Sequence, residues 1–410
     1  MNSVNGRLKR LFTASILAGF MMLPSCAGRV AYDAAVSEWG AFMHDDARTN
    51  TAPHDISVPM RLKWQRDLST LSDALEAGRP QVYASPVISG HTIFAGSKKG
   101  RFYSMDIESG DVNWTYDAGS PIEAPASAGE KLVCFGTVEG ELKCLDRTNG
   151  KEALSFKARS EVLSSPVITD KDVFFSTADR RLYAVSIDTG EKLWAYVRTS
   201  YQTIAPRIIG SPAYADGRLY HLFPDGYLVS IDAATGKEVW AKKTTIDFKS
   251  HGIIRRTPLV TSRGVFMIDG ANSIVSFNKA NGEIADTFRF AKAYDFLAIE
   301  NGLVLAGPEE ISFFELPSGK KRWSLKPEGV VASLTATDNV LFAFLNYKKP
   351  FLGIEHLSEA RARLYAIGIK DGQPLWQRTF DETISSYGAS TGRYLAVMND
   401  AGVLQLFEPE

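Results

Sequence analysis

The sequence has little of what most enzyme classes need. Its 410 residues include three cysteines, no two of them adjacent, and six histidines without metal-ligand spacing. No glycine-rich phosphate loop leads into a helix. The one cluster of histidine with carboxylates, His44-Asp45-Asp46, is typical of a solvated loop. We therefore expect no catalytic residue, metal or cofactor, and neither hydrolase nor nucleotide-binding activity.

An excess of charge of one sign is also missing. The 46 basic and 47 acidic residues give a formal net charge of -1 at pH 7. Domains that bind nucleic acid usually carry a basic patch or a large positive charge. Nucleic acid is therefore not an expected partner.

A targeting segment stands at the N-terminus. Residues 1–26 combine early basic residues with the apolar run LFTASILAGFMMLP and end on Cys26. The run is too short and wrongly flanked for a transmembrane helix, and it is typical of a signal peptide. The ending LPSC resembles the bacterial lipoprotein signal, which implies a lipid on Cys26 and, because Ala27 follows, an anchor on the periplasmic side of the outer membrane. A plain secretory signal and a soluble periplasmic protein are the alternative.

The other two cysteines, Cys134 and Cys144, lie in one predicted hairpin with the same parity about its turn. In an oxidising compartment such a pair can form a cross-strand disulfide. Two thiols that face the core are an equal alternative, because Phe94 and Ser104 fill the equivalent positions one repeat earlier. The sequence leaves both states open.

The segment SIDAATGKEVW, from Ser230 to Trp240, recurs along most of the chain. It predicts a strand end, a turn in which Gly236 takes a positive φ, and a second strand that carries Trp240. Seven copies align on Gly110, Gly150, Gly190, Gly236, Gly282, Gly319 and Gly372, and the residues four places later are Trp114, Leu154, Trp194, Trp240, Asp286, Trp323 and Trp376. A period of about 40 to 45 residues with several short strands is typical of a propeller blade. We expect these tryptophans to pack between neighbouring blades and to carry no chemistry.

Each complete repeat has four predicted strands. Ser-Pro or Thr-Pro opens the first strand in four repeats, at a position where proline is tolerated. The blades begin near Ser85, Ala124, Ser164, Gly210, Arg256, Phe296, Ala332 and Ser385. The eighth repeat has only three strands, whereas residues 61–68 form a strand with Trp64 that has no blade of its own. We expect an all-β, eight-bladed propeller over residues 59–410, closed by this N-terminal strand, after a signal peptide (1–26) and a tether and capping segment (27–58).

The repeats resemble the tryptophan-docking repeats of the superfamily of dehydrogenases that use pyrroloquinoline quinone (PQQ). Residues 39–50, WGAFMHDDARTN, resemble the N-terminal segment of secreted propellers of this type. A lipoprotein of this length with little beyond eight blades resembles the BamB family of outer-membrane β-barrel assembly lipoproteins. The quinoprotein enzymes hold PQQ against a disulfide between adjacent cysteines, beside calcium. This chain lacks the adjacent pair and the long insertions of those enzymes, so the resemblance implies the fold without the cofactor.

Function is expected on one face of the propeller, where the connections between blades emerge together with the hairpins between second and third strands. The long segments without a clear pattern are of these two kinds: residues 69–84, 197–210, 243–256 and 346–362. Basic residues gather there as well: Lys98, Lys99, Arg180, Arg181, Arg207, Lys249, Arg255, Arg256, Lys348 and Lys349. Such charges either steer a protein partner or form an ordinary solvated face.

The BamB resemblance implies that loops before the blade-start prolines contact the assembly protein BamA. The matching positions are exposed loop residues in this prediction: Ile204, Arg207, Ile208, Arg255 and Arg256, with Lys249 beside them. Arg255 and Arg256 stand where the family has acidic residues.

The sequence thus predicts a monomeric, non-enzymatic, lipid-anchored propeller that scaffolds protein partners at the outer membrane, in the manner of a β-barrel assembly factor. Two alternatives stay open at this point. One is a quinoprotein-like oxidoreductase that uses PQQ, and the other is a periplasmic module that binds peptide or glycan.

Overall fold

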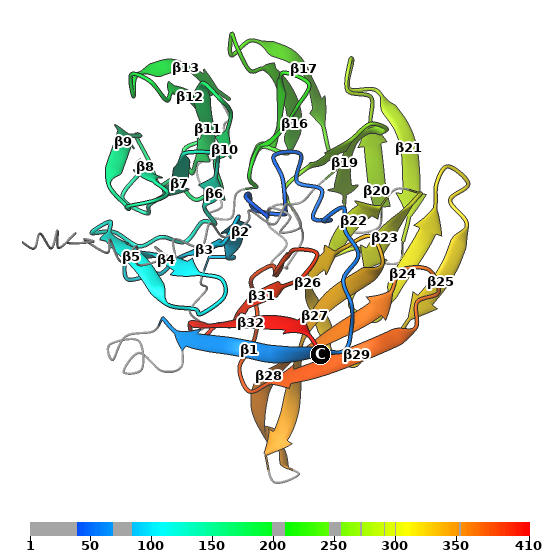
Figure 1. The fold of residues 1–410 in the computed structure, drawn as a ribbon. Helices are drawn as coiled ribbons and strands as arrows, with labels where there is room; N and C mark the ends of the chain where they lie inside the picture. Colours follow the sequence, from blue (N-terminus) through cyan, green and yellow to red (C-terminus); the bar gives the residue numbers. More distant parts are fainter. Residues whose placement is uncertain are drawn as a thin grey trace, which may run out of the picture. The chain divides into compact units, whose positions relative to one another are not determined.

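The computed structural model describes residues 39–68, 84–198, 210–245, 256–270, 273–290, 292–299, 301–351 and 354–410. These residues form a ring of eight antiparallel sheets (Figure 1). The predicted signal peptide, Cys26 and the tether up to residue 38 lie outside the described residues. Within the described ranges, no helix has the length and apolar character needed to span a membrane.

Each sheet has four strands and corresponds to one predicted blade. Blades 1 and 2 contain β2 (Val87–Ser89), β3 (Thr92–Gly96), β4 (Arg101–Asp106) and β5 (Val112–Asp117), then β6 (Ser127–Ala128), β7 (Leu132–Gly136), β8 (Glu141–Asp146) and β9 (Glu152–Lys157). Blades 3 and 4 contain β10 (Val167–Ile168), β11 (Asp172–Thr177), β12 (Arg181–Ser186) and β13 (Lys192–Val197), then β14 (Ala213–Ala215), β15 (Arg218–Leu222), β16 (Tyr227–Asp232) and β17 (Glu238–Lys243).

The remaining blades follow the same order of strands from the channel to the rim. Blades 5 and 6 contain β18 (Leu259–Thr261), β19 (Gly264–Asp269), β20 (Ser273–Phe277) and β21 (Ile284–Arg289), then β22 (Asp295–Ile299), β23 (Gly302–Ala306), β24 (Ile311–Glu315) and β25 (Lys321–Leu325). Blade 7 contains β26 (Val330–Ala336), β27 (Val340–Phe351), β28 (Ile354–Gly368) and β29 (Pro374–Phe380), and blade 8 contains β30 (Ala389–Ser390), β31 (Leu395–Met398), β32 (Val403–Pro409) and β1 (Met60–Asp67).

The ring is closed by the N-terminal strand, as the sequence predicts. Strand β1 pairs with β32 along its length, with Trp64 opposite Leu406 and Asp67 opposite Val403. Closure covers the outer edge of β32, which would otherwise be open to pairing with another chain. The eight-bladed, all-β prediction is confirmed.

Each blade core is built on a row of side chains that crosses the sheet. In blade 4, Tyr220 on the second strand and Trp240 on the fourth flank the small Ser230 between them. Because Ser230 is small, the two rings approach across it to 6.0 Å between centroids. Blade 1 repeats the arrangement with Phe94 and Trp114 at 5.9 Å.

The tryptophan of each such row also joins its blade to the next. The Trp240 ring lies on the Gly282 turn of blade 5, where a Cβ on Gly282 would come within 2.6 Å of the ring. Its indole nitrogen donates to the Lys279 carbonyl at 2.9 Å. The rings of Trp64, Trp114, Trp194 and Trp323 lie in the same way on Gly110, Gly150, Gly236 and Gly372. Trp376 instead packs near Phe407 of blade 8, at 6.1 Å.

Two glycines of the repeat motif do not receive a ring. Gly190 faces Leu154, whose side chain would lie 3.9 Å from a Cβ there, and Gly319 would have nothing within 4 Å. The reason is that the tryptophan position of the preceding repeat holds Leu154 before Gly190 and Asp286 before Gly319. Gly190 and Gly319 are therefore turn glycines on which no tryptophan ring lies, although the sequence aligns them with the other glycines of the motif. Both residues keep the turn, with φ of 70° and 66°.

Blade 2 replaces the aromatic row with a disulfide. Cys134 on β7 lies opposite Cys144 on β8, and the two sulfur atoms are bonded. The bond is fully buried in a cluster with Leu154, which occupies the tryptophan slot. Of the two states that the sequence leaves open, the structure has the disulfide.

A belt of hydroxyl groups explains the Ser-Pro and Thr-Pro pairs around the channel. The backbone N–H of Ser165 donates to the Ser211 hydroxyl at 2.9 Å, and the N–H of Ser211 donates to the Thr257 hydroxyl at 3.0 Å. The residue before each proline thus links one inner strand to the next. Sequence reasoning assigned a role only to the proline.

Residues 39–56 lie among the inner strands of the ring, as the blue trace before β1 shows (Figure 1). Backbone hydrogen bonds join this N-terminal segment to blades 1, 2, 4, 5 and 7 through Ile88, Ala128, Tyr214, Val260 and Ala336. Thr51 donates to the Ala298 carbonyl of blade 6 at 3.3 Å. The predicted capping segment is therefore part of the channel wall and follows no simple strand or helix pattern.

Candidate partner-binding face

We call the face that carries the connections between blades and the hairpins between second and third strands the loop face, and the opposite face the turn face. Five of the residues predicted to bind a partner, Ile204, Arg207, Ile208, Lys249 and Arg255, lie outside the described residues. The described residues before and after residues 199–209 and 246–255 do show how these two connections are attached to the propeller.

Both connections return to the channel at the same place. A Cβ on Gly210, which follows the first connection, would come within 2.4 Å of the Arg256 carbonyl, which follows the second. The Ser211 N–H donates to the Thr257 hydroxyl at 3.0 Å. The two connections therefore end side by side on blades 4 and 5.

The starts of the two connections are also fixed. Arg198, before the first connection, forms an ion pair with Asp225 at 2.7 Å and lies over the Tyr227 ring at 4.2 Å from its centroid. Lys243 lies near the same ring at 4.9 Å. Burial disfavours the charge of Arg198, but Asp225 outweighs it and raises the pKa of Arg198. The first connection thus begins at an arginine packed on Tyr227, and the strand before the second connection ends with a lysine near the same ring.

Arg256 does not have the exposure that the sequence suggests. Its relative exposure is 6%, so it belongs to the wall of the channel and not to the open surface. The description of Arg256 as an exposed loop residue is wrong, because the blade-start position turns inward with the inner strand. Of the other basic residues predicted on this face, Lys99, Lys348 and Lys349 are exposed.

The blade 7 insertion is regular. The prediction of an irregular segment over residues 346–362 is wrong, because β27 and β28 continue to pair from Asn346 opposite Ala362 out to Phe351 opposite Ile354. The two strands project from the ring as a ribbon (Figure 1). At its base Arg363 pairs with Glu328 at 2.6 Å and lies over Tyr347 at 4.8 Å.

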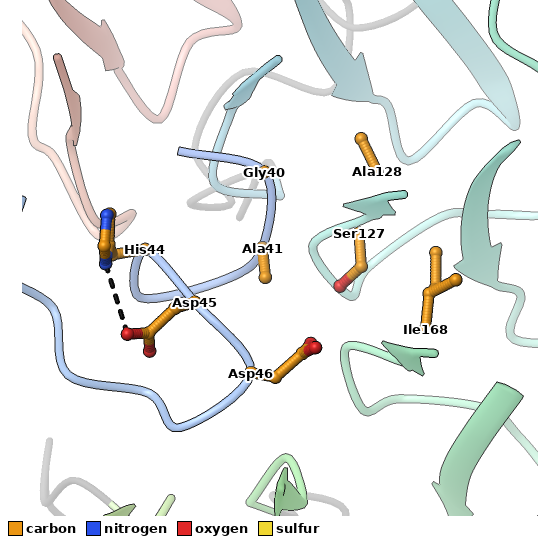
Figure 2. Close-up of a pocket in the computed structure, with 8 residues that line it drawn as sticks. All are labelled: Gly40, Ala41, His44, Asp45, Asp46, Ser127, Ala128 and Ile168. Atoms are coloured by element: carbon orange, nitrogen blue, oxygen red, sulfur yellow. Dashed lines mark ion pairs between the residues drawn. The ribbon is translucent and has the colours of Figure 1, made fainter. Parts of the chain in front are cut away.

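A cavity of about 240 Å³ lies at the channel beside the N-terminal segment (Figure 2). Its walls come from Gly40 to Asp46 and from the inner strands of blades 2 and 3, with Ser127, Ala128 and Ile168. The His44-Asp45-Asp46 cluster is therefore not a freely solvated loop. It forms one side of a hollow in the channel wall.

The two carboxylates of this cavity differ in state. Burial opposes ionisation of Asp45, but hydrogen bonds from His44 and Thr49 outweigh it and hold the pKa of Asp45 below its ordinary value. Burial raises the pKa of Asp46 to about 6 against the attraction of Arg48. Asp46 therefore keeps its proton to a higher pH than Asp45 does.

The described ranges hold no group of three or more histidine, cysteine, aspartate or glutamate side chains that could bind a metal ion. His221 is buried, and burial lowers its pKa to about 3, so it is a neutral packing residue beside Phe223.

Sequence reasoning overlooked one nucleophile-like string. Residues 388–392, GASTG, match the pattern Gly-x-Ser-x-Gly. A nucleophile of that type needs a sharp turn from a strand into a helix. Ser390 instead ends the short strand β30, is fully buried and donates to the Thr391 carbonyl at 3.4 Å. The string is therefore part of the blade 8 core.

Comparison with known proteins identifies the family. The family model described as outer membrane protein assembly factor BamB matches residues 61–134 and 122–325. The chain belongs to the BamB family. A BamB-family relative from Bordetella pertussis is 25% identical over 333 residues, which span 78% of this chain and 80% of the relative. One from Nitrosomonas eutropha is 25% identical over 172 residues, which span 41% of this chain and 40% of the relative.

Solved structures show the same fold for this BamB-family chain. BamB from Moraxella catarrhalis superposes with a TM-score of 0.66 at 15% identity and covers 85% of this chain and 100% of that chain. Quinohemoprotein alcohol dehydrogenase from Comamonas testosteroni reaches a TM-score of 0.68 at 13% identity and covers 92% of this chain and 81% of that chain. At such identities the likeness concerns the fold alone.

The residues of this BamB-family chain do not fit PQQ as the quinoprotein resemblance would require. That resemblance calls for a disulfide of adjacent cysteines against the cofactor ring. The disulfide present joins Cys134 to Cys144 inside blade 2, where both residues have 0% exposure. The N-terminal segment lies against the inner strands of the ring, and its Arg48 is fully buried there.

Proposed function

We propose that this chain is a non-enzymatic, lipid-anchored scaffold on the periplasmic side of the outer membrane, and that it serves the assembly of β-barrel proteins by holding a protein partner on its loop face. The observation that carries the proposal is membership of the BamB family, whose relatives bear the name outer membrane protein assembly factor. A BamA-like assembly protein is the proposed partner.

The attachment of the two connections supports the loop face as the docking site. Arg198 and Gly210 flank the first connection, and Thr245 and Arg256 flank the second. Gly210 and Arg256 lie next to each other. Thr245 is held by its hydroxyl, which donates to Asp269 at 2.9 Å.

The loop contact can be tested by charge reversal. The double variant Arg207→Glu, Arg255→Glu is expected to keep its free energy of unfolding within about 0.5 kcal/mol of the wild type, because loop substitutions rarely exceed that. It should associate more slowly with the purified periplasmic part of the BamA-family protein of the same bacterium, because charge steers the encounter. Surface plasmon resonance measures the association rate, and urea denaturation measures the stability.

The matched control is Lys237→Glu on the turn face, at an exposed position. This variant should bind like the wild type. If Lys237→Glu slows association and the double variant does not, the loop face is the wrong face.

The anchor is tested separately. Cys26→Ser should move the protein from the membrane fraction to the soluble periplasm, because the lipid would have no attachment point. Folding should be unchanged, since the ring of blades is built from residues after Cys26. Fractionation of cells followed by immunoblotting gives the result, and unchanged membrane association of the variant would contradict the anchor.

A further inference from the structure

The groove between blades 1 and 2 on the turn face is filled by an arginine of the chain itself. Arg147 follows β8, and its guanidinium donates to the Gly129 carbonyl at 2.6 Å and to the Ser89 carbonyl at 3.0 Å. It also lies over the Phe94 ring, 6.0 Å from the centroid. The groove thus shows what this fold can bind between two blades.

The groove between blades 3 and 4 has the same construction without the arginine. Phe174 occupies the position of Phe94, since each lies opposite the first residue of its inner strand, Val167 or Val87. Ala233 occupies the position of Arg147. The tryptophan of the preceding blade identifies this equivalence. Trp194 donates to the Ala233 carbonyl and Trp114 donates to the Arg147 carbonyl, both at 2.9 Å.

A cavity of about 280 Å³ opens where the arginine side chain would extend. Its walls include two aromatic rings, Phe174 and Tyr214, which are nearly parallel at 13° with centroids 6.2 Å apart. Tyr214 stands where the blade 1–2 groove has Ala128, so it adds a second ring. The hairpin Thr169 to Asp172 and residues Gly217, Ala233 and Ala234 complete the lining.

The charge of the lining favours a cation. Asp170 and Asp172 lie on the hairpin side, and Lys171 is the one basic residue of the lining. Burial raises the pKa of Asp172, and repulsion from Asp188 raises it further, whereas attraction from Lys171 lowers it. The negative charge of Asp172 is therefore unfavourable where it lies, and a cation in the cavity would stabilise it. The matching hairpin of blade 1 carries Gly90 and Thr92 at these two positions and has no carboxylate there.

We propose that the groove between blades 3 and 4 on the turn face binds an arginine side chain of a protein partner. The guanidinium stacks on Tyr214, whose ring lies against the buried ring of Phe174, and it pairs with Asp170 and Asp172. Arginine suits the site better than lysine, because its planar guanidinium stacks on rings and forms forked hydrogen bonds with carboxylates. The site lies on the face opposite the proposed docking loops and does not depend on that proposal.

The probe is a short glycine peptide with one central arginine and blocked ends, titrated into the mature protein at low salt and followed by calorimetry. We expect binding of the arginine peptide to be at least about fivefold tighter than that of the matching lysine peptide. Absence of binding, or equal binding of the two peptides, would overturn the proposal.

The decisive variant fills the groove from within. Ala233→Arg should place a guanidinium where Arg147 lies between blades 1 and 2, and it should weaken binding of the arginine peptide at least about tenfold. Asp172→Asn should weaken it in the same direction. The control is Ala280→Arg, which adds the same charge at an exposed turn of blade 5, outside the groove.

The control should keep wild-type binding and all variants should keep the wild-type circular dichroism spectrum. Equal loss of binding in Ala233→Arg and Ala280→Arg would show a general charge effect and reject the site. Wild-type binding by a folded Ala233→Arg protein would also reject it.

Discussion

Replacing Trp240 by alanine is expected to lower the free energy of unfolding by about 3 to 5 kcal/mol. The ring has 7% exposure, packs against Tyr220 in its own blade and covers the Gly282 turn of the next. Alanine removes these contacts and the hydrogen bond from the indole to the Lys279 carbonyl, which keeps its bond from Arg218 at 2.7 Å. Urea denaturation followed by circular dichroism gives the free energy, since fluorescence would change with the tryptophan itself.

The contact between blades can be separated from the loss of volume by changing the glycine instead. Gly282 and Gly319 have φ of 71° and 66°, so alanine is strained equally at both. Of these two glycines, only Gly282 would place its added Cβ within 2.6 Å of a tryptophan ring. Gly282→Ala should therefore destabilise the protein more than Gly319→Ala. Equal losses would mean that the ring contributes little to the joint between blades.

The ring of blades could be predicted because its signals are local and repeated. A turn glycine with a positive φ and a tryptophan four residues later are both set by short-range geometry, and seven copies fix the period. The closing strand followed from counting, since Trp64 had no blade and the last repeat lacked a strand. Failures of the motif were also visible in the sequence, at Leu154 and Asp286.

Features that depend on distant partners could not be predicted. The hydroxyl of Ser211 matters because it meets the N–H of Ser165, 46 residues away in the chain. Arg256 was misplaced because burial at a blade start depends on where the next inner strand lies. The sequence of the blade 7 ribbon does not predict strands, because charged residues, Pro350 and Gly353 interrupt its alternation. Its pairing comes from continuation of the sheet below it.

Arg48 is the clearest example of a residue whose role depends on partners that are distant in the chain. In the sequence it is one arginine in a polar segment, whereas in the structure it has 0% exposure. Its guanidinium donates to the carbonyls of Pro166 at 2.9 Å in blade 3, Pro212 at 3.0 Å in blade 4 and Phe42 at 2.9 Å in its own segment. One side chain thus fastens the N-terminal segment to two blades.

Arg48→Met is expected to lower the free energy of unfolding by about 3 to 5 kcal/mol. The buried Pro212 carbonyl loses its Arg48 donor, which costs about 1 to 3 kcal/mol, and the bonds to Phe42 and Pro166 are each worth about 1 kcal/mol, since Pro166 keeps a bond from the Ser127 hydroxyl. The gain from no longer burying a charge offsets part of this loss. Arg48→Lys should lie between methionine and the wild type, since it keeps the charge with fewer donors. The matched control, Arg322→Met, removes an exposed arginine with a 3.7 Å ion pair to Glu315 and should change stability by less than about 1 kcal/mol.

Limited proteolysis provides the second measurement for Arg48→Met. Release of residues 39–56 from the channel should expose this segment to cleavage while β1 remains paired with β32, because the β1 pairing uses none of the hydrogen bonds of Arg48. A variant that is as stable and as resistant to protease as the wild type would show that the segment only fills space. Cleavage before β1 together with a large loss of stability would show that the buried guanidinium holds the segment in the ring.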